Sequence, residues 1–220
     1  MSDFATLEVA DRDAASPPVW RIGETVPWVA PWTGEDEFSL QPSTDFPGKM
    51  ELVQSTDPGV GTPVLDGMHV MRQRRGVAEH LCHVCGRPTP RHDRWLFPVI
   101  TGGFTPVADG SMRYTSHLPP VHLACARHAQ TACPHVRATA AHPVRFPEKP
   151  GHVLCETNPP AKMSGIAAGL PPGMQVIYGY VRVHTAGFTR LVQRLRAADE
   201  AMRAHPSPLA GEGGGRTPAG

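Results

Sequence analysis

The sequence contains little of what marks a membrane, secreted or nucleotide-binding protein. No stretch approaches the about 18 consecutive apolar residues that cross a bilayer, so we expect no membrane association. The opening MSDFATLEVADRDAAS is acidic and lacks the charged start and apolar run of a secretory signal. No phosphate-binding glycine loop, Ser-His-Asp order or paired-carboxylate motif is found. The sequence therefore offers no catalytic constellation.

Cysteine is also scarce. The chain has five cysteines, an odd number, and two of them lie in one C-x-x-C. Without a signal peptide, this arrangement favours metal or redox chemistry over a disulfide framework. We therefore expect a cytoplasmic protein.

Aromatic residues make up only 6% of the chain, whereas proline (25) and glycine (22) are abundant. Because proline fixes φ and removes a hydrogen-bond donor, long helices are disfavoured wherever it clusters. We expect a small, irregular α+β domain with loop-rich flanks. The predicted divisions are an acidic, partly disordered Pro/Trp arm at 1–66, the folded domain at 67–204, and a disordered tail at 205–220, with residues 1–17 also disordered.

The formal net charge of +1 conceals an uneven distribution. Residues 1–70 carry three basic and twelve acidic side chains, a balance of −9. Residues 71–150 carry eleven and four, a balance of +7, and residues 151–220 carry seven and four, a balance of +3. The middle third also holds eight of the twelve histidines. Such a basic, histidine-rich segment suits a metal site or a polyanion partner.

Local patterns predict several elements of the central domain. Alternation and turn signals predict strands at 94–100 and 112–118 that pair as a hairpin with a long loop. A helix is expected at 121–133, because prolines precede it and Pro134 follows it. Towards the C-terminus the patterns predict strands at 152–156 and 174–185 and an amphipathic helix at 187–203.

The segment CHVCG presents two cysteines separated by two residues. Cys82 and Cys85 can reach one metal ion from a tight knuckle, and Gly86 supplies the permissive backbone that such a turn needs. A tetrahedral zinc site requires two further ligands. A pair of buried free thiols and a redox C-x-x-C are the competing interpretations.

A second stretch, HLPPVHLACARHAQTACPH, offers the missing ligands. Cys125 and Cys133 would lie about 12 Å apart along one helix, too far to share an ion whose sulfur ligands lie about 4 Å apart. His122 and Cys125 share one face of the first helical turn and are the preferred pair. His128, Cys133 and His135 remain possible replacements for His122.

The order of knuckle, hairpin and helix in residues 80–135 resembles the treble-clef class of zinc fingers. The matching residues are CHVCG (82–86), the strands near 94–100 and 112–118, and HLAC (122–125). The resemblance implies one structural Zn²⁺ per chain, held by Cys82, Cys85, His122 and Cys125. Treble clefs serve nucleic-acid binding, protein binding and nucleases alike, so the resemblance alone does not identify a function.

Three functions are therefore open. The chain could be a non-catalytic module that binds nucleic acid through the basic region 72–113, with arginines 72, 74, 75, 87, 91, 94 and 113 on phosphates. It could instead bind a protein through its tryptophan arm or C-terminal helix. The alternative is an HNH-like, metal-dependent nuclease with His117 as general base.

Overall fold

A computed structural model describes residues 19–98, 103–138, 142–149, 151–159, 163 and 165–204. The predicted disordered segments at 1–17 and 205–220 lie outside these residues. No helix in the described part of the chain has both the length and the apolar character to cross a membrane.

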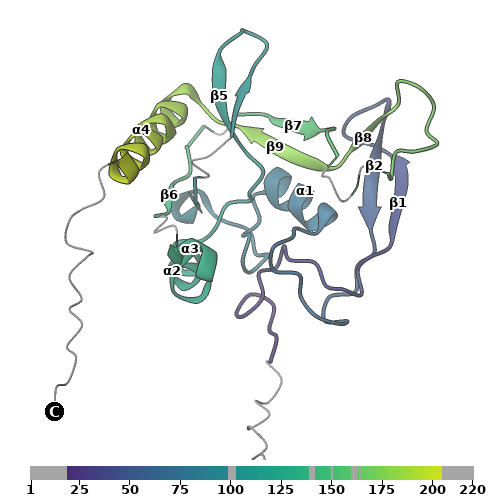
Figure 1. The fold of residues 1–220 in the computed structure, drawn as a ribbon, viewed down its shortest axis with the longest axis horizontal. Helices are drawn as coiled ribbons and strands as arrows, with labels where there is room; N and C mark the ends of the chain where they lie inside the picture. The colour runs from purple at the N-terminus through teal and green to yellow at the C-terminus, as the bar shows by residue number, and fades with distance from the viewer. Residues whose placement is uncertain are drawn as a thin grey trace, which may run out of the picture.

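Runs of short strands are separated by helices along the chain, and the longest helix, α4, comes last (Figure 1). The helices are α1 (Val70–Glu79), the 3-10 turn η1 (Arg91–Asp93), α2 (Leu123–Ala132), α3 (Pro134–Ala138) and α4 (Ala186–Ala204). The strands are β1 (Phe38–Pro42), β2 (Lys49–Gln54), β3 (Trp95–Leu96), β4 (Phe104–Pro106), β5 (Met112–Ser116), β6 (Val144–Arg145), β7 (Val153–Glu156), β8 (Gln175–Ile177) and β9 (Gly179–Val183). The expected mixed α+β class is confirmed.

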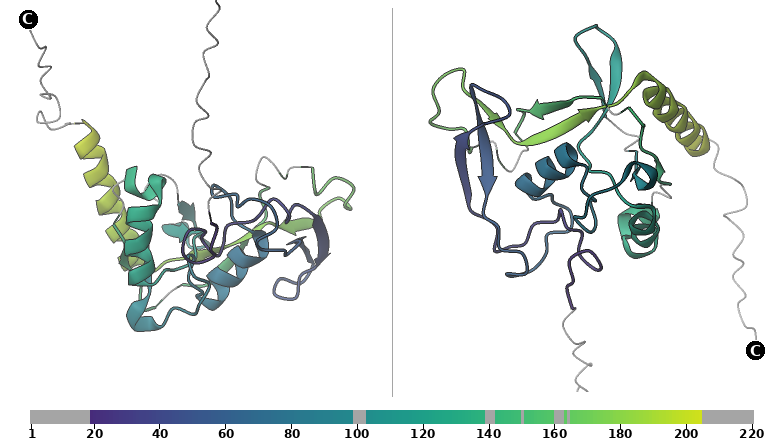
Figure 2. Two further views of the ribbon diagram at one scale, coloured as in Figure 1. Left: turned by 90° about the horizontal axis from the view of Figure 1, so that it is seen from below. Right: turned by 180° about the vertical axis from the view of Figure 1, so that it is seen from behind.

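Three small sheets organise the described residues, in the orders β1-β2-β8, β3-β6 and β4-β5-β9-β7. Tyr178 alone separates β8 from β9, so one length of chain joins the two larger sheets. Figure 2 shows α1 beneath β9, between these sheets, with α2 and α4 on one side of it. The strands expected at 152–156 and 174–185 correspond to β7 and to the β8–β9 segment, and the C-terminal helix corresponds to α4.

The predicted hairpin between 94–100 and 112–118 is wrong. Within the described part of the first segment, residues 94–98, only Trp95 and Leu96 form a strand, and they pair with β6. Strand β5 pairs instead with β4 and, on its other side, with β9. Pro98 cannot donate to a ladder, whereas β4 reaches β5 through a tight turn that Gly110 completes at φ 77°. The shorter loop also costs less closure entropy.

The N-terminal arm contacts later parts of the chain from Gly23 and Glu24 onwards. Strand β2 pairs in parallel with β8, more than a hundred residues later. The Trp28 backbone N–H donates to the Val84 carbonyl at 2.7 Å, and the Trp32 side chain is buried. The arm therefore lies against the C-x-x-C segment; a folding boundary at residue 66 stays a prediction.

Helix α1 buries polar side chains where the sequence suggested only an exposed basic run. The Arg72 guanidinium pairs with the buried Glu35 carboxylate and donates to the Trp28 and Ala30 carbonyls at 2.9 and 3.1 Å. Buried polar groups require partners, because an unpaired one loses its hydration without compensation. This pairing attaches the N-terminal arm to α1.

The other buried residues on α1 attach it to the sheets. The Gln73 amide donates to the carbonyls of His117 and Tyr180, both at 2.7 Å. Its oxygen accepts from the Tyr180 backbone N–H at 3.0 Å. Arg74 pairs with Glu51 of β2 at 3.6 Å. Helix α1 is thus connected to β2, β5 and β9 by hydrogen bonds and charge rather than by apolar contact alone.

Helix α4 docks through an aromatic cluster centred on His184. The imidazole stacks on Phe188 at 4.6 Å between centroids and lies 5.4 Å from the rings of Tyr114 and Phe146. Burial, reinforced by the Arg182 charge, lowers the pKa of His184 to about 3. The ring is therefore neutral near pH 7 and packs as an aromatic residue.

Replacing Glu35 by alanine should destabilise the protein strongly, because it leaves the Arg72 charge buried without its carboxylate. Loss of one partner of a buried pair costs about 3–5 kcal/mol. Urea unfolding measures this change. Glu79→Ala is the control, since it breaks the exposed Arg75–Glu79 pair, which is worth at most about 1 kcal/mol. Equal losses in the two variants would contradict the assigned role of the buried pair.

Candidate metal centre

The first pair of candidate ligands sits on a closed backbone loop. The Cys82 N–H donates to the Arg87 carbonyl at 2.7 Å, and the Gly86 N–H donates to the Cys82 carbonyl at 2.8 Å. Gly86 has φ 72°, and a Cβ there would lie 2.7 Å from the Trp28 ring. Glycine is therefore required at this position both by conformation and by space. This is the knuckle that the sequence predicts.

The second pair begins α2. His122 is its N-cap residue and Cys125 lies in its first turn, as expected from the sequence. The residue before His122 is fixed by two hydrogen bonds between Val121 and Trp95, at 2.8 and 2.9 Å. Asp93 then accepts from the Leu123 N–H at 2.8 Å, which caps the start of the helix. The backbone thus holds both ligands in place.

A backbone hydrogen bond joins the two ligand-bearing segments directly. The His83 N–H, within the knuckle, donates to the Pro120 carbonyl at 2.8 Å, two residues before His122. Cys82 and Val84 pack with Val121 and Ala126 in one small buried cluster. Segments almost forty residues apart are therefore held together by backbone bonding and apolar contact around the candidate ligands.

Cys82, Cys85, His122 and Cys125 form a cluster that could hold a metal ion. One ligand atom from each lies within 4.8 Å of those from the other three. The His122 Nδ1 is 3.5 Å from the Cys85 sulfur and 3.9 Å from the Cys125 sulfur. A tetrahedral ion with Zn–S and Zn–N bonds of ordinary length separates S and N by about 3.6 Å. The observed spacing fits this geometry.

A hydrogen bond at Nε2 orients the imidazole of His122 so that Nδ1 can bind a metal ion. Its Nε2 lies 3.1 Å from the Pro88 carbonyl, which can only accept a hydrogen bond. A proton on Nε2 leaves the Nδ1 lone pair directed at the sulfurs. Metal-bound histidines commonly have such an outer hydrogen bond, which fixes both tautomer and ring orientation.

The three thiols cannot all ionise easily in the absence of a cation. Burial, with the neighbouring Cys82 and Cys85, raises the pKa of Cys125 to about 12. Burial also raises the pKa of Cys82. At Cys85 burial opposes ionisation, but hydrogen bonds, led by the Arg87 N–H, outweigh it and lower the pKa. A divalent cation would supply the charge that allows three thiolates to coexist.

The three candidate replacements for His122 lie outside this cluster. His128 is exposed, with Nε2 2.7 Å from the Glu24 carbonyl. Cys133 is the C-cap residue of α2, at the far end of the helix from His122. His135 follows in α3. Of the four candidates that the sequence left open, the structure brings only His122 to the knuckle, among the residues described.

His117, the general base of the nuclease hypothesis, lies beside a carboxylate and not beside the candidate metal ligands. His117 follows β5, and its Nδ1 lies 3.0 Å from the Glu156 carboxylate of β7. That hydrogen bond outweighs burial and raises the pKa of His117. His117 is not one of the four clustered residues.

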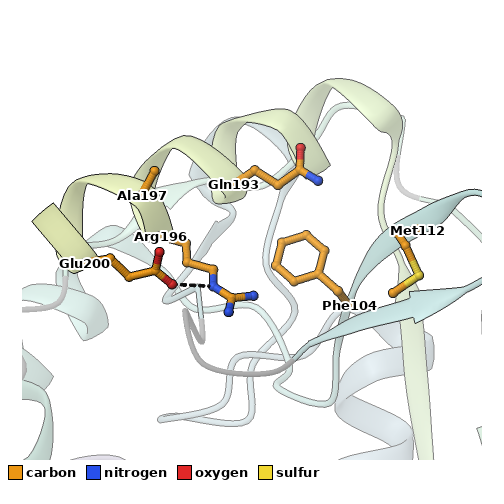
Figure 3. Close-up of a pocket in the computed structure, with 6 residues that line it drawn as sticks. All are labelled: Phe104, Met112, Gln193, Arg196, Ala197 and Glu200. Atoms are coloured by element: carbon orange, nitrogen blue, oxygen red, sulfur yellow. Dashed lines mark hydrogen bonds and ion pairs between the residues drawn. The ribbon is translucent and has the colours of Figure 1, made fainter.

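Two open hollows mark the surface. The first has a volume of about 460 Å³ and lies against the cluster of candidate metal ligands. It is lined by Cys85, Arg87, Pro88, Asp93, His122, Ala124 and Cys125. The second, of about 300 Å³, lies between α4 and the β4–β5 hairpin, where Phe104 and Met112 face the helix (Figure 3). Its wall includes the Arg196–Glu200 ion pair at 2.8 Å. Only the first hollow adjoins candidate ligands.

Sequence reasoning missed the groups that support the ligands. Asp93 precedes the helix that it caps by thirty residues, and the Pro88 carbonyl accepts from His122 across thirty-four. No local pattern signals such contacts, because they depend on how the chain returns to the knuckle.

No protein-family model matches this chain, and neither a curated protein nor a solved structure shows significant similarity to it. The geometry of the site is therefore the evidence for the function of this protein.

His122→Ala should reduce metal affinity by at least about 100-fold, the upper end of what outer-shell changes cost. His128→Ala should leave the affinity unchanged, because His128 lies outside the cluster. Competition between the protein and a chromophoric chelator measures both affinities. A loss in His128→Ala that matched or exceeded the loss in His122→Ala would show that the ligand assignment is wrong.

Proposed function

We propose that this protein is a non-catalytic zinc-binding module of treble-clef type, in which Cys82, Cys85, His122 and Cys125 hold one structural Zn²⁺. The resulting domain binds nucleic acid or another protein. The observation that carries the zinc assignment is the placement of His122. Its Nδ1 faces two cysteine sulfurs while its Nε2 faces a carbonyl, as a metal ligand requires.

The donor set favours zinc over other divalent ions. Three thiolates and one imidazole are soft or borderline donors, and the spacing is tetrahedral, which suits Zn²⁺ rather than Mg²⁺ or Ca²⁺. Four protein ligands leave no open coordination position for a reacting water. These features support a structural rather than a catalytic role.

The local path of the chain supports the treble-clef assignment. The knuckle is followed by a pairing between Trp95 and Val121, and Val121 leads directly into the ligand-bearing helix. The hairpin of the treble clef is thus reduced to this short pairing. The β4–β5 hairpin, from Phe104 to Ser116, lies between the two paired residues as an insertion.

Zinc would contribute to folding by linking α1 to α2. The knuckle follows α1 after only a few residues, and α2 carries the other two ligands. The hydrophobic clusters around them are small. Because ligands gather only in the folded state, metal-binding free energy stabilises that state directly.

Elemental analysis of protein purified without a histidine tag tests this proposal. The wild type should contain one zinc per chain. Cys82→Ser and Cys125→Ser should lose both the zinc and the folded state, as followed by circular dichroism. Cys133→Ser and Cys155→Ser are matched controls and should retain one zinc. A folded, zinc-free wild type with five titratable thiols would overturn the proposal.

A further inference from the structure

Only some of the arginines in the predicted basic region 72–113 are available to bind a partner. Arg72 and Arg74 are buried in ion pairs, so they cannot contact phosphate. Arg75 pairs with Glu79, and Arg113 pairs with Asp109. The remaining arginines are 87, 91 and 94, all within nine residues of Cys85.

A fourth arginine joins them from a distant part of the sequence. Arg145 of β6 pairs with Trp95 of β3, and its guanidinium donates to the His92 carbonyl at 2.7 Å. Its Cζ lies 5.5 Å from the Trp95 ring centroid. The side chain is thus held in place beside η1. Arg87 adjoins this region, because it lines a hollow together with Asp93 of η1. We call the four side chains Arg87, Arg91, Arg94 and Arg145 the arginine cluster.

The cluster has cationic character that its surroundings do not neutralise. Among the described residues, no member of the cluster forms an ion pair with a carboxylate. The Asp93 carboxylate, beside them, accepts from the backbone N–H at the start of α2 and keeps its negative charge, so the four arginines and Asp93 together carry a formal charge of +3. From residue 110 to 147 the sequence contains no aspartate or glutamate. Burial, and then the Arg91 charge, lower the pKa of Arg94, which shows that these guanidiniums repel one another.

Geometry as well as charge suits an anion. Arg87, Arg91 and Arg145 are exposed, and Arg87 lines the hollow of about 460 Å³ against the metal cluster. Arg94 is braced by the Thr89 carbonyl, which accepts from its Nη2 at 2.6 Å and from its Nε at 3.1 Å. Guanidinium groups fixed by the fold lose little entropy when they bind phosphate.

We propose that the arginine cluster is a binding face for the sugar–phosphate backbone of duplex nucleic acid. The proposal rests on the proposed zinc module, because the knuckle and the start of α2 position Arg87 and η1. Duplex is favoured over single strands because Trp95, the aromatic ring beside the cluster, is covered by Arg145 and cannot stack on a base. Contacts to phosphate alone confer no sequence specificity.

Fluorescence anisotropy with a labelled 20-base-pair duplex, at several salt concentrations, tests this assignment on the zinc-loaded full chain. Binding should weaken steeply with salt, with a slope of log K against log [salt] of about −3 to −4 for three or four phosphate contacts. The double variant Arg87→Ala/Arg91→Ala should bind about tenfold more weakly and lower the slope by about two. Arg145→Ala should lower it by about one.

The matched control removes the same charge elsewhere. Arg190 and Arg194 are exposed on α4, and Arg190→Ala/Arg194→Ala should change affinity less than twofold. Zinc content and circular dichroism are measured for every variant. Zinc-loaded wild type that does not bind the duplex at the lowest salt would overturn this inference while leaving the zinc proposal intact. Equal loss in the control, or tighter binding to polyglutamate of matched charge, would also overturn it.

Discussion

The buried polar side chains of α1 are the constraint on which the rest of the structure depends. Arg72, Gln73 and Arg74 lie on consecutive positions, and each is buried. Their partners come from three separate parts of the chain: residues 28–35 before β1, the β2 strand, and the β9 strand together with His117 after β5. Since an unpaired buried charge costs several kcal/mol, these segments can take up few other arrangements. A helix with only apolar buried side chains would also pack well. It would select its neighbouring segments less specifically, because apolar contacts are not directional.

The cluster of candidate metal ligands is positioned in part by the same helix. Helix α1 ends where His80 adopts φ 58°, and the chain turns from there into the knuckle. The Trp28 backbone donates to Val84, so the arm that Arg72 holds also supports the knuckle from behind. The second pair of ligands is supported separately, by the Trp95–Val121 pairing and by Asp93. Two independently supported segments therefore bring their donors to one point.

The part of the site that depends on local spacing could be predicted from sequence. Cys82 and Cys85 are separated by two residues and followed by Gly86. His122 lies three residues before Cys125 at the start of a helix. The geometry within each pair depends mainly on the local backbone. Helix α4 could also be predicted, from its helical spacing of apolar residues, and the β8–β9 segment from its content of valine, isoleucine and tyrosine. The spacing further excluded Cys133 from an ion held by Cys125, and the structure places Cys133 at the opposite end of α2.

The parts that depend on distant pairing could not be predicted. From sequence, the arginines of α1 look like a basic run on the surface. They are buried because Arg72 pairs with Glu35 and Arg74 pairs with Glu51, and both glutamates lie well upstream in the chain. Strand β3 was assigned to a hairpin with 112–118, whereas its partner β6 lies almost fifty residues further on. Two-residue strands have no periodicity of their own, so their pairing depends entirely on tertiary structure.

X-ray absorption at the zinc edge of the purified protein tests the central claim most directly, because it counts and identifies the atoms around the metal. The account predicts three sulfurs at about 2.3 Å and one nitrogen at about 2.0–2.1 Å. A shell of nitrogen and oxygen alone, or one with two sulfurs or fewer, would contradict the assignment of Cys82, Cys85, His122 and Cys125 as the ligands.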